Sequence, residues 1–151
     1  MRLTPVKDFL LYIEDCHQAL ADLYQRLSAE ATDHKVTLLL KYMQNQEQLS
    51  YKNLNNFVQE ASPILLDTWL DNNFDQSFPL RCKGLKLNPE LAIKDVVTLS
   101  TKLGIQLIEL MQTAAFDSHT IEAEIALEHL TDKEEEMLQQ AVIVSHEFEY
   151  M

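Results

Sequence analysis

The chain has 151 residues, 46% of them hydrophobic, and a formal net charge of −12 at neutral pH. A chain of this size suits one domain with a continuous core, so we expect a single domain over residues 1–151. The negative charge repels phosphate backbones and anionic lipid surfaces, which argues against nucleic acid and membrane partners. With only two glycines and four prolines, the composition is typical of an all-α protein.

The cysteines and the N-terminal region bear on the cellular compartment. Cys16 and Cys82 are too few for a disulfide framework, and no paired-thiol zinc motif is present. The apolar run at residues 9–13 lies between acidic residues and is too short to span a bilayer or to act as a secretory signal. We therefore expect a cytoplasmic protein.

The first half of the chain predicts a helical hairpin. The first helix is expected to begin at Pro5, with Thr4 as its N-cap, and its pattern fades at residues 29–32. A second start signal at Thr32 and Asp33 opens a helix that ends near Ala61, before a Ser-Pro pair. Because the connection is short, the two helices should be antiparallel. The inward stripe of the first helix is Phe9, Ile13, Cys16, Leu20, Leu23 and Leu27, with His17 and Tyr24 beside it.

Residues 63–88 form one long connection that contains Trp69, Phe74 and Phe78. These aromatic side chains argue against a solvated linker, so we expect an ordered crossover with a short helix near residues 64–70. The aromatic side chains either cover the bundle or form a partner surface. A crossover that runs the length of the bundle would make the third helix parallel to the second.

The second half predicts another hairpin. Asn88 and Pro89 repeat the cap-then-proline signature and should open the third helix, and Asp117 and Ser118 mark a short turn before a fourth helix that ends near Phe148. The third helix has its own stripe: Ile93, Val97, Ser100, Leu103, Leu107, Met111 and Ala114. The expected architecture is an all-α four-helix bundle of two antiparallel hairpins joined by one long crossover.

Two polar residues interrupt the apolar stripe of the second helix. In heptad order this stripe reads Val36, Leu40, Met43, Glu47, Ser50, Leu54 and Phe57, so Glu47 and Ser50 should face the interior. A carboxylate in a core must be paired, protonated or bound to a metal. The fourth helix repeats the pattern 87 residues later, with Glu134 in the slot of Glu47: Ala123, Leu127, Leu130, Glu134, Met137, Ala141 and Val144.

This repeat resembles the ferritin-like superfamily, nearest in layout to its rubrerythrin branch. In that family two helices carry an E-x-x-H motif, and the other two each carry one metal-binding Glu, the first of them followed by a Tyr. The resemblance implies that Glu47 and Glu134 match the two motif glutamates and that Tyr24 matches the tyrosine. The chain departs from the family elsewhere: Ser50 and Met137 stand in the histidine positions, and His17 and Gly104 stand where the remaining glutamates would fall. A di-iron centre needs four carboxylates and two imidazoles, so its ligand set is incomplete.

Two functions remain open. The first is a non-catalytic association or regulatory module, expected as a homodimer or with another protein partner, with no catalytic residues and no cofactor. The second is a metal-binding or redox protein that holds iron or another divalent metal at Glu47, Glu134 and His17. Without a metal, the two glutamates would form hydrogen bonds inside the core or remain protonated, and His17 would be a satisfied core histidine.

The sequence offers a few other candidate functional sites. No histidine has the H-x-x-x-E or H-x-x-x-D spacing of hemerythrin, and no glycine-rich phosphate loop is present. Cys82 lies between Arg81 and Lys83, which could make it reactive, but we expect an ordinary surface thiol. A small-molecule pocket beside Gly104 is a third possibility, and its expected lining is Tyr24, Met43, Met111 and Met137.

Overall fold

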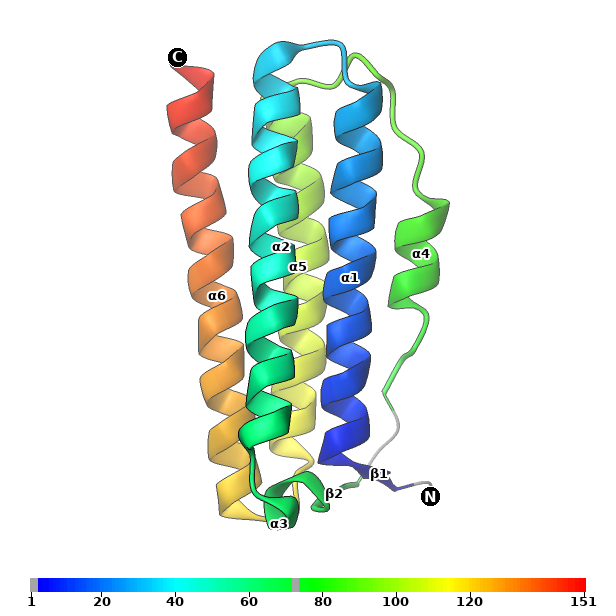
Figure 1. Ribbon diagram of the computed structural model, residues 1–151, viewed down its shortest axis with the longest axis vertical. Helices are drawn as coiled ribbons and strands as arrows, with labels where there is room; N and C mark the ends of the chain where they lie inside the picture. The colour runs from blue at the N-terminus through cyan, green and yellow to red at the C-terminus, as the bar shows by residue number, and fades with distance from the viewer. Residues whose placement is uncertain (1–2, 72–73) are drawn as a thin grey trace.

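The computed structural model describes residues 3–71 and 74–151 and shows a bundle of four long helices (Figure 1). α1 and α2 form one antiparallel hairpin and α5 and α6 form the other, and the connection between the hairpins returns along the whole bundle, so α5 runs parallel to α2 (Figure 1). The expected architecture of two hairpins and one long crossover is confirmed. The four helices are α1 (Val6–Glu30), α2 (His34–Glu60), α5 (Ile93–Phe116) and α6 (Ile121–Glu149).

The first hairpin begins differently from the prediction. Asp33 caps α2 as expected, because its side chain accepts a hydrogen bond from the backbone N–H of Lys35. Thr4 is not the cap of α1. The N-cap is Pro5, without a side-chain hydrogen bond, and the two residues instead form β1 (Thr4–Pro5), which pairs antiparallel with β2 (Trp69–Leu70).

The crossover contains two short helices, α3 (Pro63–Leu66) and α4 (Phe78–Gly84). α3 overlaps the first part of the short helix predicted near residues 64–70, whereas α4 was not predicted. α4 lies beside α1 on the outside of the bundle (Figure 1). Arg26 of α1 fixes the end of α4 because its guanidinium donates to the backbone carbonyls of Cys82 at 3.1 Å and Leu85 at 2.7 Å. A cation is favourable at this end of a helix.

The expectation of a surface thiol at Cys82 is wrong. α4 turns this side chain and that of Phe78 into the core, and both are fully buried. Burial raises the pKa of the Cys82 thiol to about 11, although the charge of Arg81 opposes the shift. The two cysteines of the chain are free, and Cys16 is buried as predicted.

The third long helix starts later than predicted. α5 begins at Ile93, and its first turn is closed by Asp95, whose carboxylate accepts from the backbone N–H of Ala92. The Asn88-Pro89 pair forms a turn instead, because Asn88 accepts a hydrogen bond from the N–H of Glu90. The carbonyl of Pro89 is used elsewhere: it accepts from the N–H of Thr32 at 3.1 Å, which ties the crossover to the α1–α2 turn.

Most residues of the predicted inward stripes lie in the core, but Val97 is only half-buried and its neighbour Val96 is fully buried instead. Val36, Leu40 and Leu127 are almost completely buried, and the two stripe glutamates lie among them. Phe74 and Phe78 of the crossover cover the bundle, and the ring of Phe74 packs edge-on against Phe9 with centroids 5.0 Å apart. In the part of the chain that the structure describes, no helix is long and apolar enough to cross a membrane.

Candidate functional site

The structure brings the three predicted site residues together at the centre of the bundle. His17 of α1 lies between Glu47 of α2 and Glu134 of α6, and all three side chains are buried. The Nδ1 atom of His17 is 2.6 Å from Oε2 of Glu47, and its Nε2 atom is 2.6 Å from Oε1 of Glu134. We call this arrangement the Glu-His-Glu triad.

The triad geometry favours a doubly protonated imidazole. Carboxylate oxygens only accept hydrogen bonds, so a ring whose two nitrogens each contact a carboxylate satisfies both contacts when it carries a proton on each nitrogen. Burial by itself would lower the pKa of His17, but the negative charges and hydrogen bonds of Glu134 and Glu47 outweigh it and raise the pKa to about 10. His17 is therefore an imidazolium cation at neutral pH.

The charge of the imidazolium balances the cost of burying its partners. Burial raises the pKa of Glu47, and the charge and hydrogen bond of His17 act in the opposite direction. Short charge-assisted hydrogen bonds of this kind are the stronger class in proteins. Tyr24 lies nearby on α1, and burial followed by the charge of Glu47 raises the pKa of its phenol well above the usual value.

The other two motif positions also face each other. Ser50 donates a hydrogen bond to the sulfur of Met137 at 3.0 Å, so the positions that hold histidine in the E-x-x-H motifs are paired by side chains that are weak metal ligands. Gly104, at the fourth glutamate position, lies against α6: a Cβ atom there would come within 3.1 Å of Cδ1 of Leu138. The family positions are thus filled by packing groups.

These donors do not fit a di-iron centre. The centre of the bundle offers two carboxylates and one imidazole, and both nitrogens of that imidazole already face carboxylates. A metal-bound imidazole must turn one unprotonated nitrogen to the ion. Among residues 3–71 and 74–151, no group of three or more His, Cys, Asp or Glu side chains is arranged to hold a metal ion.

Two small cavities flank the triad. The cavity on the side of Gly104 has a volume of about 30 Å³ and is lined by Tyr24, Met43 and Met137 among others. This volume has room for a water molecule or two and not for an organic ligand. The second cavity, of about 100 Å³, lies beside Met111, Ser50 and Lys133. The predicted pocket is therefore divided by the triad, and Met111 lines the other part.

One buried acid was not predicted as part of the core. Glu14 lies one turn before His17 and is 4% exposed, and its Oε1 atom has no hydrogen-bond partner among the described residues. Burial raises the pKa of its carboxyl group, and the side chain of Asn55 partly opposes this. A signal was present in the sequence, because Leu10, Glu14, His17 and Ala21 follow heptad spacing and all four are buried.

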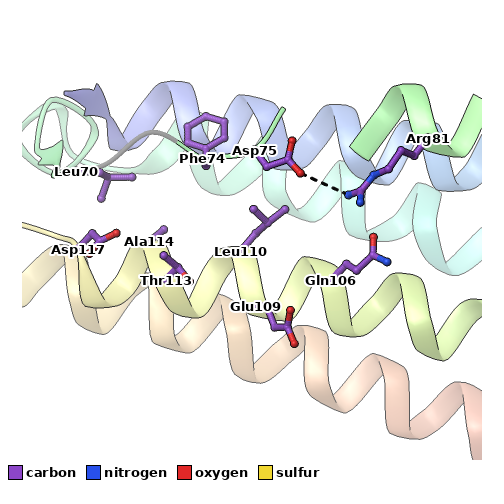
Figure 2. Close-up of a pocket in the computed structure, with 10 residues that line it drawn as sticks. All are labelled: Leu70, Phe74, Asp75, Arg81, Gln106, Glu109, Leu110, Thr113, Ala114 and Asp117. Atoms are coloured by element: carbon purple, nitrogen blue, oxygen red, sulfur yellow. Dashed lines mark ion pairs between the residues drawn. The ribbon is translucent and has the colours of Figure 1, made fainter. Parts of the chain in front are cut away.

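A larger groove of about 320 Å³ opens between the crossover and α5 (Figure 2). Leu70 and Phe74 line it from the crossover, and Leu110 and Ala114 line it from α5. Its polar lining includes Asp75 and Arg81, a loose ion pair at 3.9 Å that Figure 2 marks with a dashed line, together with Gln106, Glu109, Thr113 and Asp117.

The described side chains of the groove lining bear on whether it could support a reaction. Among the described residues that line it there is no histidine or cysteine, so the hydroxyl of Thr113 has no histidine there to activate it. Hydrogen bonds from Ser77 lower the pKa of Asp75, so this carboxylate is a poor proton acceptor at neutral pH. The groove can receive a side chain or a small molecule, but its chemistry does not indicate a reaction.

Comparison with known proteins supports the fold. No family model matches the chain, and no curated protein matches it. Among solved structures, the chain is similar to a Thermotoga maritima protein described as a ferritin-like diiron-carboxylate protein. The identity is 17% and the TM-score is 0.64, and the match covers 97% of this chain and 98% of that one. At this identity the likeness concerns the fold, and it shows that the chain folds as a ferritin-like helical bundle.

Proposed function

We propose that this chain is a non-catalytic ferritin-like bundle that acts in protein association, with an internal ion-pair cluster at its centre in place of a di-iron site. The observation that carries this proposal is the position of His17, with both ring nitrogens 2.6 Å from the glutamates that match the E-x-x-H motifs. The imidazolium supplies the positive charge that these buried carboxylates need. The centre therefore serves to hold α1, α2 and α6 together.

The surface of the bundle supports a role in association. Several large apolar side chains remain exposed, among them Phe116 and Ile121 at the α5–α6 turn and Ile64 in α3. Exposed apolar groups that lie close together are typical of interaction sites. A homodimer is one form of association that we propose, and the free cysteines fit a reducing cytoplasmic compartment.

The test is a metal titration of the purified chain. The protein is stripped with a chelator, incubated anaerobically with Fe²⁺, Mn²⁺ or Zn²⁺, desalted and analysed for metal by mass spectrometry. We expect far less than one ion per chain, and an unchanged thermal unfolding curve in chelator, because the ligand atoms are engaged with one another.

A matched set of variants gives this experiment its control. The double variant Glu47→Ala, Glu134→Ala removes the two triad carboxylates, whereas Glu135→Ala removes a neighbouring carboxylate outside the triad. Stoichiometric metal that is lost in the double variant and kept in Glu135→Ala would overturn the proposal. That result would establish the metal-binding alternative at Glu47, Glu134 and His17.

A further inference from the structure

One end of the bundle exposes a group of large apolar side chains. Four of them define what we call the apolar end: Phe116 is 86% exposed, Ile64 78%, Ile121 75% and Trp69 46%. They belong to α3, β2 and the two sides of the α5–α6 turn, which lie together at the lower end in Figure 1. Buried apolar area is the main source of affinity at protein interfaces, and tryptophan is enriched among the residues that dominate it.

The elements of the apolar end are fixed to one another. Leu70 forms an isolated β-bridge with Ser118, and the N–H of Asp71 donates to the carbonyl of Asp117 at 3.0 Å. The carboxylate of Asp71 also forms a hydrogen bond with the ring of His119. These bonds join the segment that carries Trp69 to the turn that carries Phe116 and Ile121, so the apolar end is a surface on a rigid frame. A preformed surface loses less conformational entropy on binding.

The charged side chains of the two segments that form the apolar end are mostly acidic. Residues 60–71 and 116–125 contain six acidic residues and neither lysine nor arginine. Four of the six are exposed and two are half-buried. Lys7 and Asp8, in the first turn of α1 next to β1, carry opposite charges. The six acidic residues are Glu60, Asp67, Asp71, Asp117, Glu122 and Glu124.

The exposed apolar side chains and the acidic residues around them together indicate the kind of partner that would bind here. From the charge and the exposed apolar groups we infer that the apolar end docks a basic amphipathic helix of another protein, with an apolar stripe against Trp69, Phe116 and Ile121 and with lysine or arginine facing the acidic rim. This inference rests on the proposed role in protein association and names the partner class. Complementary charge across an interface speeds encounter and excludes wrong partners.

A second copy of the chain fits this end less well. Two copies that met end to end would bring the six acidic residues of one against the six of the other, and like charges across an interface are unfavourable. The basic face of α4, with Leu80, Arg81 and Lys83, offers one exposed apolar side chain. A contact between α4 and the apolar end would also be heterologous, and it would build open chains of molecules.

The test uses Trp69, which is the single tryptophan of the chain. A synthetic helix of leucine and lysine is titrated into the full chain while tryptophan fluorescence is followed, with a leucine and glutamate helix of the same pattern as the comparison. We expect the basic helix to shift Trp69 emission to shorter wavelength and to bind more weakly as salt rises, and the acidic helix to leave the emission unchanged.

Variants locate the binding surface. Phe116→Ser and the pair Asp67→Lys, Glu122→Lys should each weaken binding of the basic helix by tenfold or more. Two control variants at the other end or on other faces, Ile143→Ser and Glu30→Lys, should leave it unchanged, because these exposed residues belong to α6 and α1 away from the apolar end. Circular dichroism of each variant confirms that it is folded.

Three results would overturn the inference. The basic helix could fail to bind, the acidic helix could bind equally well, or Phe116→Ser could bind as the parent does. Sedimentation equilibrium, which measures the oligomeric state, distinguishes a failure of this inference from a failure of the proposed function. Dimers that Phe116→Ser dissolves would assign the apolar end to a second copy, which contradicts this inference and keeps a role in association. Stoichiometric metal at the triad contradicts the proposed function itself.

Discussion

The Nδ1 atom of His17 lies 2.6 Å from Oε2 of Glu47, and both side chains are buried where α1 packs against α2. The other ring nitrogen contacts Glu134, so a single imidazolium joins three helices.

Removal of the cation should destabilise the bundle strongly. His17→Leu leaves two carboxylates buried without a counter-charge, and loss of one partner of a buried ion pair costs about 3–5 kcal/mol. Urea unfolding should show this decrease in the free energy of unfolding. The triple variant His17→Leu, Glu47→Met, Glu134→Leu removes all the charges and should recover most of the loss. Equal stability of the single variant and the parent would contradict the ion-pair assignment.

The stability of the parent should fall as the pH rises from neutral. The pKa of His17 is about 10 in the folded chain and near 6.5 in the unfolded chain, so the folded form holds one more proton between these values. The stabilisation is complete below pH 6.5 and is lost as the pH rises towards 10, with a slope of at most about 1.4 kcal/mol per pH unit.

Urea unfolding at several values from about pH 6.5 to 7.5 measures this slope, because the cysteines of the unfolded chain, with pKa values of about 8.5, are still protonated there. The triple variant without the triad should show little slope, whereas His129→Gln, which removes an exposed histidine of α6, should keep that of the parent. A parent whose stability is constant or increases across this range would show that His17 is neutral in the folded chain.

Neither cysteine should react while the chain is folded. Burial raises the pKa of Cys16 to about 12 and that of Cys82 to about 11, so the thiolate that reacts with an alkylating agent is scarce. Mass spectrometry after treatment with iodoacetamide near pH 8 should find no modification in the native protein and two modified thiols in urea. The variant Leu80→Cys provides an exposed thiol on the same short helix and should react at once. Rapid native labelling at Cys82 would mean that α4 leaves α1.

Gly104→Ala should stabilise the bundle slightly. Alanine is favoured over glycine inside a helix by about 1 kcal/mol. The added methyl would come within 3.1 Å of the flexible end of Leu138, and this side chain borders a cavity of about 30 Å³ into which it can shift. We expect a net gain of about 0.5 kcal/mol in thermal unfolding. Gly104→Val should destabilise the bundle, because a branched side chain is too large for that space. A marked loss with alanine would show that α5 and α6 cannot separate at this point.

The sequence was most informative where the chain is regular. The heptad spacing placed Glu47 and Glu134 in the interior from two interruptions alone, and both are buried as that spacing requires. The position of His17 beside the stripe of α1 predicted that its ring could reach these two glutamates. The spacing could not show that this ring contacts both carboxylates at once, because that depends on how three helices rotate against each other.

The sequence was least informative where tertiary contacts override local signals. Asn88 and Pro89 have the pattern of a helix start, but the carbonyl of Pro89 is held by Thr32 and α5 starts at Ile93. Cys82 lies between two basic residues, yet the rotation of α4 buries it while Arg81 stays exposed. Phe78 and Cys82 lie four residues apart on one face of α4, but local sequence does not show that this face packs against α1.

The most direct test of the account is the protonation state of His17 by nitrogen-15 NMR of its ring near pH 8 in metal-free buffer. An imidazolium between two carboxylates predicts two protonated ring nitrogens, whose signals titrate only near pH 10 and do not change when Zn²⁺ or Fe²⁺ is added. A neutral ring with one unprotonated nitrogen at pH 8, or ring signals that shift stoichiometrically with added metal, would contradict the claim that an internal ion pair closes the centre of the bundle.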